Sequence, residues 1–492
     1  MDIKVQQKDW LFLLVCLGLG ILAELSFFHG SIGVSYLVFI AGLYAVVFLR
    51  FRLTFTHRRI GLLVMVAIWL LAASYLLYDN FLFYSLNSFI IPVLVFFHIV
   101  LITSPNKLRW STPVFVTLLT NKLGEGIKYS SSFCNKGFRR VFKNMDEQTA
   151  QTVKRILIGV IIGLPLLLLI TGLLMSADAV FQDIVLRFPR YIVQLNFLEG
   201  AFRFVIVIVL TFVFFGVFQV LQGRPNPKAS DYDTEEWNVR WNSVTAITIL
   251  VLLNSVYVLF AAIQFKYFFS NGLQEGLTFA EYARRGFFEL MIVTLINWTI
   301  LISCLKLIDE KRKSLKITIK IMYSLLIGVS CVMLASAYQR LSMYEAAYGF
   351  TLDRILAHAF MVFLIVIFAY TLIKVWVERL SLLHFYLIVG LLFYTGLNVI
   401  HIEKIIVDNN LERYERTEKI DIHYLNSLSY TGVNGLIELY EKNPEYPQLE
   451  NVLANRIEWA ERRSEGSWQS FNFMKQEVTQ KLQELELKEE SR

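Results

Sequence analysis

The feature that most constrains this chain is a series of apolar runs, each about as long as a bilayer is thick. A helix needs about 20 consecutive apolar residues to cross the hydrocarbon core of a membrane. Since 56% of the residues are hydrophobic and only 18% are charged, a soluble domain of ordinary composition is excluded. We predict an all-α integral membrane protein with about 11 transmembrane helices and a small helical C-terminal domain. The runs lie at roughly 10–28, 31–50, 60–78, 81–103, 155–176, 201–221, 242–265, 286–305, 317–337, 354–375 and 380–400.

The positions of Lys and Arg predict how the chain is oriented in the membrane. Short loops rich in these residues stay in the cytoplasm, and the links at 50–59, 104–155, 306–316 and 374–379 are basic. The net charge of +7 is concentrated in such loops, as in proteins that face anionic lipid, so nucleic-acid binding is excluded. We expect a multi-pass protein of a bacterial cell membrane with a cytoplasmic N-terminus. An odd number of crossings then places the C-terminal region outside the cytoplasm.

Four parts follow from these runs: helices at 1–103, a basic cytoplasmic segment at 104–154, seven helices at 155–400 and a polar helical domain at 401–492. Within the basic segment, aromatic and basic residues alternate at helical spacing, which favours a helix on the inner lipid surface over a protein-binding arm. These residues are Phe133, Lys136, Phe138, Arg139, Arg140, Val141, Phe142 and Lys143. The domain at 401–492 contains the helix-like patterns "GLIELYEKN" and "SWQSFNFMKQEVTQKLQELELKEE".

Charged and aromatic residues gather in the predicted outer links, where short turns would have sufficed. Ionisable groups at such depth are costly unless they are paired or wet, so we expect Glu289, Arg340 and Arg354 to pair across helices. Snorkelling to head groups and an interfacial aromatic belt remain open alternatives. The candidate outer-face polar cluster comprises Tyr282, Arg284, Arg285, Glu289, Arg340, Tyr344, Glu345, Tyr348 and Arg354.

Isolated polar residues occur in other apolar runs. Glu24 lies near the outer end of the first run, where we expect it to be paired or snorkelling, and Glu199 with Arg203 forms a candidate ion pair. We interpret His98 and His384 as packed or hydrogen-bonded helix residues, because no second ligand stands at metal-binding spacing.

Motifs of catalysis and of cofactor binding are missing from the sequence. It contains no HExxH, no Gly-rich phosphate loop, no GxSxG and no CxxC, and its four cysteines show no paired spacing. We therefore predict no catalytic, cofactor-binding or metal site.

Several motifs carry a resemblance: "SADAVF" (176–181), "YARRGFFEL" (282–290), "SAYQRLSMYEAAYGFTLDR" (336–354), "NNLERY" (409–414) and "KIDIHYLNSLS" (419–429). The chain resembles a bacterial polytopic membrane family catalogued as domain of unknown function 4173, which is related to unknown-function family 4153. The resemblance implies a multi-helix membrane body, a short polar C-terminal domain and outer-face motifs. It implies no activity.

Three functions remain open at this point. The first is a non-enzymatic, sensor-like or scaffolding envelope protein, whose partners are the lipid bilayer and an envelope protein or lipid ligand. The second is a transporter or lipid-handling protein, in which Arg285, Arg340 and Arg354 contact an anionic group at an outer cavity. The third is a membrane-embedded enzyme that uses Glu289 or Glu345 as an acid or base.

Overall fold

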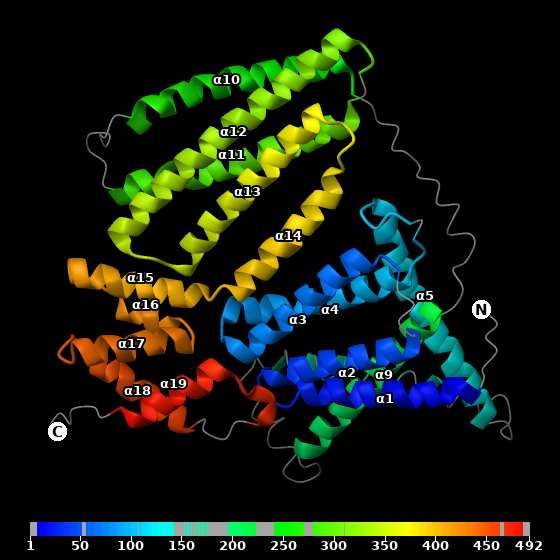
Figure 1. The fold of residues 1–492 in the computed structure, drawn as a ribbon. Helices are drawn as coiled ribbons and strands as arrows, with labels where there is room; N and C mark the ends of the chain where they lie inside the picture. Colours follow the sequence, from blue (N-terminus) through cyan, green and yellow to red (C-terminus); the bar gives the residue numbers. More distant parts are fainter. Residues whose placement is uncertain are drawn as a thin grey trace. The chain divides into compact units, whose positions relative to one another are not determined.

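The computed structural model describes residues 7–51, 56–106, 108–141, 195–222, 241–269, 279–308, 310–462 and 467–485, with scattered positions between 152 and 175. Throughout these residues the regular elements are helices (Figure 1). Ten of the described helices are long and apolar enough to cross a membrane. This confirms the predicted all-α membrane architecture. The predicted run at 155–176 lies outside the described residues, apart from scattered helical positions.

The ten helices follow the apolar runs closely, because a buried or lipid-facing backbone must satisfy its own hydrogen bonds within the helix. They are α1 (Gln7–Phe27), α2 (Val34–Phe51), α3 (Arg58–Leu77), α4 (Phe81–Thr103), α9 (Leu195–Gln222), α10 (Ser243–Phe269), α11 (Phe279–Leu307), α12 (Lys313–Tyr348), α13 (Leu352–Trp376) and α14 (Leu382–Val399). The longest is α12, whose 36 residues extend for about 54 Å. This is longer than a hydrocarbon core of about 30 Å, so part of α12 would extend beyond it.

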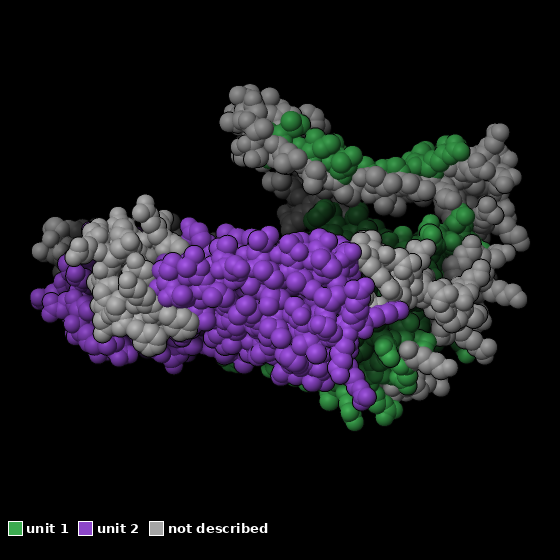
Figure 2. All heavy atoms as spheres, turned by 90° about the horizontal axis from the view of Figure 1, so that it is seen from above, with its two compact units in different colours: residues 1–77, 84–232, 463–473 green, residues 78–83, 233–462, 474–492 purple. Residues whose placement is uncertain are grey.

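The chain divides into two compact units, which are coloured separately in Figure 2. The first comprises residues 1–77, 84–232 and 463–473, and the second comprises residues 78–83, 233–462 and 474–492. The predicted four-part division remains a prediction.

In the first unit, α1 and α9 run antiparallel. Gln219 near the end of α9 donates to Asp9 near the start of α1 at 2.9 Å, and Arg50 at the end of α2 donates to Gln219 at 3.0 Å. Thr56, just after α2, donates to the carbonyl of Ile102 in the last turn of α4 at 3.0 Å. The last turns of α2, α4 and α9 therefore share one end of the unit. If these helices span the bilayer, the chain changes sides between the end of α4 and the start of α9, as the predicted crossing at 155–176 requires.

The basic segment contains helix α5 (Pro113–Val141), which packs within the first unit. Phe115 contacts the Phe97 ring with centroids 5.3 Å apart, and Phe133 contacts Phe215 at 4.7 Å. The Phe133 side chain is buried against protein, because Phe215 and Trp10 lie over it. The placement of the segment on the inner lipid surface remains a prediction. The side chains from residue 138 onward lie outside the described residues.

The second unit contains α10 to α14 and most of a polar helical domain at the C-terminal end. The domain is formed by α15 (Ile402–Thr417), α16 (Ile422–Ser427), α17 (Tyr430–Lys442), α18 (Leu449–Arg462) and α19 (Phe473–Glu484). A short 3₁₀ helix, η2 (Trp468–Ser470), precedes α19 and belongs to the first unit. Apolar side chains from successive helices form a common core, which includes Ile406, Leu425, Leu436, Leu453 and Val478. The helical C-terminal domain was predicted correctly.

Candidate functional site

The turn between α12 and α13 is the centre of the candidate site, and Gly349 makes it. Its φ of +87° lies in the region that favours glycine. A Cβ atom at this position would lie 2.6 Å from Oδ1 of Asn410 in α15. The turn can therefore approach α15 only because residue 349 has no side chain.

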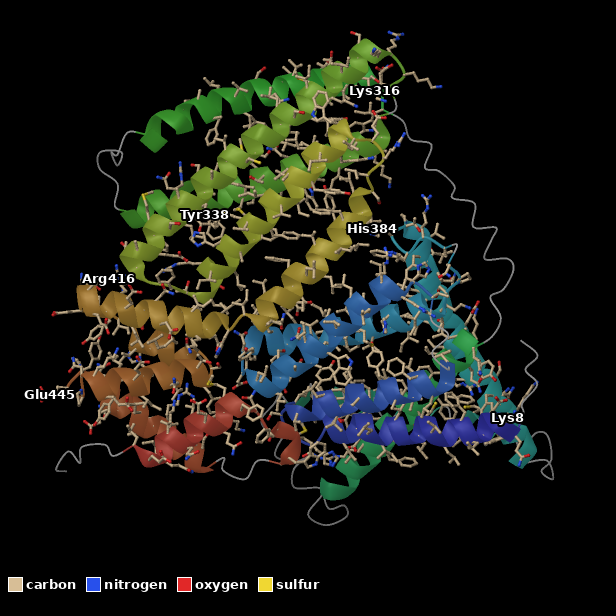
Figure 3. The ribbon with its side chains drawn as sticks, in the orientation of Figure 1. Lys8, Lys316, Tyr338, His384, Arg416 and Glu445 are labelled. Atoms are coloured by element: carbon tan, nitrogen blue, oxygen red, sulfur yellow. The ribbon has the colours of Figure 1, made fainter. Side chains whose placement is uncertain are left out.

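A buried acid lies one turn before it on α12. Glu345 is only 5% exposed, and its Oε2 lies 3.2 Å from Nδ1 of His358 on α13. His358 Nε2 lies 3.3 Å from the Ser342 hydroxyl oxygen and 3.3 Å from the Tyr338 carbonyl oxygen. The Tyr338 ring, labelled in Figure 3, contacts the imidazole with centroids 4.3 Å apart and the ring planes tilted by 49°. A pairing of this kind offsets the cost of burying a carboxylate and joins α12 to α13.

Arg354, at the start of α13, folds back onto the same turn. Its guanidinium carbon lies 4.2 Å from the centre of the Tyr344 ring, and its Nη1 donates to the carbonyl of Gly349. The Tyr344 and Tyr348 rings contact each other with centroids 4.9 Å apart. The structure thus brings four of the predicted residues together, and it uses Arg354 to close the helix end by a cation–π contact and a hydrogen bond.

The remaining predicted residues lie on α11 and α12. Tyr282, Arg284 and Arg285 are in the first turns of α11, and their side chains lie outside the described residues. Glu289 is exposed on α11 and Arg340 is half-buried on α12. The expected pairing among Glu289, Arg340 and Arg354 remains a prediction.

The C-terminal domain holds the turn through three side chains, which we call the clasp: Asn410, Arg413 and Tyr424. Asn410 accepts from the Phe350 amide at 3.0 Å and donates to the Phe350 carbonyl at 2.9 Å, so one side-chain amide binds both polar groups of one residue. Arg413 donates to the Ala347 carbonyl at 2.7 Å. The Tyr424 hydroxyl accepts from the Leu352 amide at 2.8 Å.

The clasp was absent from the predicted cluster, although its residues lie in the quoted motifs "NNLERY" and "KIDIHYLNSLS". Asn410 and Arg413 are three residues apart on α15, and this spacing places them on one helix face. That spacing could have identified them as a pair on one helix face. No local pattern indicates that they bind a backbone segment about 60 residues earlier in the chain.

A second polar group lies in the same unit, at the first turn of α15. Glu403, only 5% exposed, accepts from Asn80 in the link before α4 at 2.8 Å and from the Ser429 hydroxyl before α17. His401 Nε2 lies 2.9 Å from the Thr431 hydroxyl oxygen. These contacts join three segments that are far apart in the sequence. We use the name α15 joint for Glu403 together with Asp79, Asn80, His401, Ser429 and Thr431.

Burial governs the charges at the α15 joint. Desolvation, with smaller contributions from nearby groups such as Asp79, raises the pKa of Glu403 to about 7. Desolvation also raises the pKa of Asp79, although Lys475 opposes that shift. The same effect lowers the pKa of His401, and Lys404 lowers it further. The joint therefore holds two carboxyl groups in surroundings that favour their neutral forms.

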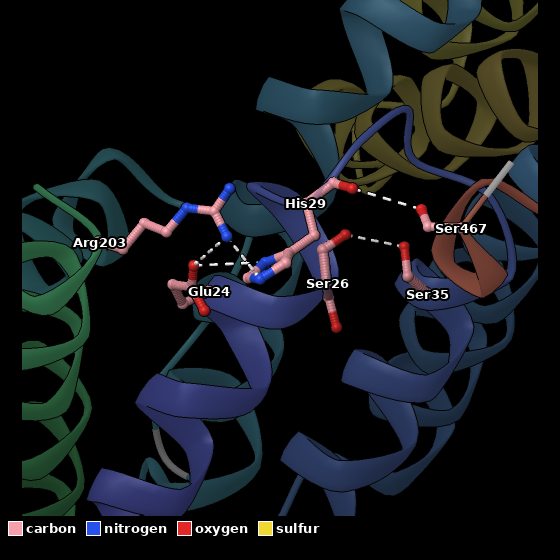
Figure 4. Close-up of polar contacts among 6 residues, drawn as sticks. All are labelled: Glu24, Ser26, His29, Ser35, Arg203 and Ser467. Carbon is pink, nitrogen blue, oxygen red and sulfur yellow. Dashed lines mark hydrogen bonds and ion pairs between the residues drawn. The ribbon is translucent and has the colours of Figure 1, made fainter. Parts of the chain in front are cut away.

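In the first unit, Glu24 is paired, as was expected. Its Oε1 lies 3.3 Å from His29 Nδ1 and 3.8 Å from Arg203 Nη1 (Figure 4). Arg203 Nη1 also lies 2.5 Å from His29 Nε2. Since a guanidinium can only donate, the Nε2 atom accepts and the ring proton lies on Nδ1, facing Glu24. The side chain of Glu199, the partner expected for Arg203, lies outside the described residues.

No cluster of metal-ligating side chains occurs among the residues that the structure describes. His98 bonds to the Tyr44 hydroxyl at 2.8 Å and is buried, which confirms its interpretation as a hydrogen-bonded helix residue. On the C-terminal domain, α15 and α17 line a surface pocket of about 310 Å³. Its lining mixes apolar, acidic, basic and amide groups: Leu411, Tyr414, Glu415, Glu418, Leu439, Lys442 and Asn443.

A comparison with protein-family models gives a match over most of the chain. The family model described as "Domain of unknown function (DUF4153)" matches residues 65–439. This is the family that the sequence resemblance named as related, and the match does not confirm the 4173 name. No curated protein and no solved structure matches the chain. The match covers α12, α13 and α15 and therefore includes the clasped turn.

Proposed function

The chain belongs to the DUF4153 family, and we propose that it is a non-enzymatic, sensor-like or scaffolding protein of a bacterial envelope. Its C-terminal domain lies outside the cytoplasm and binds an envelope protein. The main observation that supports this proposal is the clasp. Asn410, Arg413 and Tyr424 bind the backbone of the α12–α13 turn and leave it little freedom to move without the domain. A partner that displaces the domain therefore acts directly on two membrane helices.

The contacts within each unit support the proposed orientation. In the second unit the α12–α13 turn and the link at 78–80 both contact α15, and these segments were all expected on the outer side. At the opposite end of α12, Lys316 and Lys320 each lie 2.8 Å from Glu378 after α13. Basic residues at that end favour the cytoplasm. The basic helix α5, in this orientation, lies on the cytoplasmic side of the first unit.

The geometry favours this proposal over transport of an anionic group. Arg354 would have to bind the anion, yet its guanidinium is engaged by Tyr344 and Gly349 within the turn. Breaking a cation–π contact and a charge-assisted hydrogen bond would oppose binding of the anion. A lipid-handling role would require this turn to open.

The geometry also argues against a hydrolytic role for Ser342, His358 and Glu345. Their order resembles a nucleophile, base and acid. However, the Ser342 hydroxyl donates to the Tyr338 carbonyl at 2.9 Å, a shorter distance than the 3.3 Å to His358. A serine whose proton is bound to the backbone of its own helix is not activated by the imidazole.

The test compares partners captured by cross-linking in living cells for the wild type and for N410A/R413A. We expect the double variant to lose cross-links made from the C-terminal domain, because the domain is no longer held in place. Arg416→Ala is the matched control: Arg416 lies on the same helix and bonds to Glu412 on the surface at 3.2 Å. Partner sets that are equal in all three proteins would refute the proposal. Loss of partners in R416A alone would show that the exposed face, and not the clasp, is responsible.

A further inference from the structure

Residues 467–473, which we call the strap, have an inverted distribution of polar and apolar side chains. Gln469 and Asn472 are buried, whereas Trp468 is 53% and Phe473 is 52% exposed. Phe471 is 37% exposed, and its ring contacts Phe473 with centroids 5.2 Å apart. In a segment that faces water, the amides would be outside and the aromatic rings inside. The strap has the opposite arrangement.

The strap is attached to the ends of the first three membrane helices. The Phe471 carbonyl accepts from the Val34 amide at the start of α2 at 3.0 Å. Asn472 donates to the Tyr75 carbonyl near the end of α3 at 2.9 Å. The Ser467 hydroxyl donates to the His29 carbonyl between α1 and α2 at 3.3 Å (Figure 4).

The close approach at α2 depends on a glycine. A Cβ atom on Gly33 would lie 2.4 Å from the Phe471 carbonyl oxygen and 2.9 Å from the Gln469 carbonyl oxygen. The backbone of the strap therefore lies directly on the turn between α1 and α2. The strap also accounts for a late helix start: the helical pattern "SWQSFNFMKQEVTQKLQELELKEE" begins at Ser467, whereas α19 begins only at Phe473.

The position of the strap specifies what its aromatic rings meet. The ends of membrane helices lie at the level of the lipid head groups, where Trp and other aromatic side chains are favoured. Close in sequence to the residues that bind the strap, Phe28 just after α1 and Val38 on α2 are exposed apolar side chains. Leu14 and Ile21 on α1 and Leu49 on α2 are exposed as well. The strap's aromatic side is thus close to the lipid-facing surface of the unit.

We infer that the strap is a lipid-binding surface, whose Trp468, Phe471 and Phe473 rings insert into the interface of the leaflet that contacts the α1–α2 turn. The occupant is the head-group and upper acyl region of a bilayer. The strap adds a lipid contact to the hydrogen bonds that tie the end of the chain to α1, α2 and α3. This inference does not depend on the proposed function, because it rests on the first unit alone.

The test measures the immersion depth of nitroxide labels on the full chain in phosphatidylcholine–phosphatidylglycerol vesicles. Labels are placed at W468C and F473C, in a protein whose four native cysteines are replaced by alanine. Collisions with oxygen report lipid and collisions with a water-soluble nickel complex report water. Leu11→Cys on the exposed face of α1 provides the lipid reference. Glu412→Cys on the surface of α15 provides the water reference.

We expect both strap labels to collide more with oxygen than with nickel, at a ratio between those of the two references. A ratio equal to that of the Glu412 label would place the rings in water and overturn the inference. Low collision with both reagents would show a protein-covered strap and would overturn it equally.

An unlabelled comparison guards against distortion by the nitroxide. Hydrogen exchange of the strap amides is measured in vesicles for the wild type, for W468S/F471S/F473S and for the aromatic control W468F/F471Y/F473Y. We expect faster exchange only in the serine variant. Equal exchange in all three proteins would show that bonds to α1, α2 and α3 hold the strap without lipid.

Discussion

Replacing Glu403 by Gln tests whether the α15 joint responds to protons. Burial raises the pKa of Glu403 from 4.5 to about 7. A group whose pKa is raised by folding contributes stability that is fully present below its unfolded pKa and is lost as the pH rises through its folded pKa. For Glu403 this window extends from about pH 4.5 to about pH 7.

The size of the effect follows from the pKa difference. One pKa unit corresponds to about 1.4 kcal/mol, so a shift from 4.5 to about 7 corresponds to about 3 kcal/mol of stability lost between the two limits. The titratable groups near the joint include Asp79 and Tyr78 in the link before α4, His401, Lys404 and Asp408 on or beside α15, Tyr424 on α16 and Lys475 on α19. Asp79, whose pKa is also raised, adds to the effect.

The assay is hydrogen exchange of the α15 amides in the purified full chain at pH 5.5 and pH 8, corrected for the intrinsic pH dependence of exchange. In the wild type we expect protection to fall by more than about tenfold at the higher pH, since 1.4 kcal/mol is tenfold in an equilibrium constant. Glu403→Gln cannot ionise and retains an acceptor oxygen for Asn80. Its protection should therefore change much less. An equal change in amide protection between pH 5.5 and pH 8 in the two proteins would refute the argument from burial.

Three further predictions concern the clasped turn, each measured as a melting temperature of the purified chain in detergent. Gly349→Ala should lower stability by at least about 1 kcal/mol, because φ is positive and a Cβ would clash with α15; an unchanged melting temperature would contradict this. His358→Ala should cost about 3–5 kcal/mol by leaving Glu345 buried without its partner. Adding Glu345→Gln should recover part of that loss, and no recovery would show that the pair is not coupled. Tyr424→Phe should cost about 1–3 kcal/mol, since the Leu352 amide loses its acceptor; a neutral effect would mean that water replaces the hydroxyl.

Much of the membrane architecture could be predicted because one local property governs it. A bilayer requires about 20 apolar residues per crossing, and the runs at 31–50 and 81–103 correspond closely to α2 and α4. The ends were predicted less well. The predicted run at 317–337 becomes α12, Lys313–Tyr348, because the helix continues beyond its apolar run where the polar side chains find partners. Tyr344 and Glu345 find theirs in Arg354 and His358.

The site was predicted in part, and the reason lies in sequence separation. Charge and aromatic content identified Tyr344, Glu345 and Arg354, since such groups are unusual beside apolar runs. His358 was missed because a single histidine within an apolar run gives no sign that an acid 13 residues earlier faces it. Glu403 was missed for the same reason, since its donors lie in the link before α4 and before α17.

The sequence by itself determined that the chain is helical, that it has many membrane crossings and that a polar helical domain follows them, because hydropathy and periodicity act over 20 residues or fewer. Only the tertiary structure decided that Asn410, Arg413 and Tyr424 bind the α12–α13 turn. It also decided that the strap's aromatic rings point outward while its amides are buried. Side-chain direction at these places is selected by backbone groups tens to hundreds of residues away, and no local pattern specifies which of them will be met.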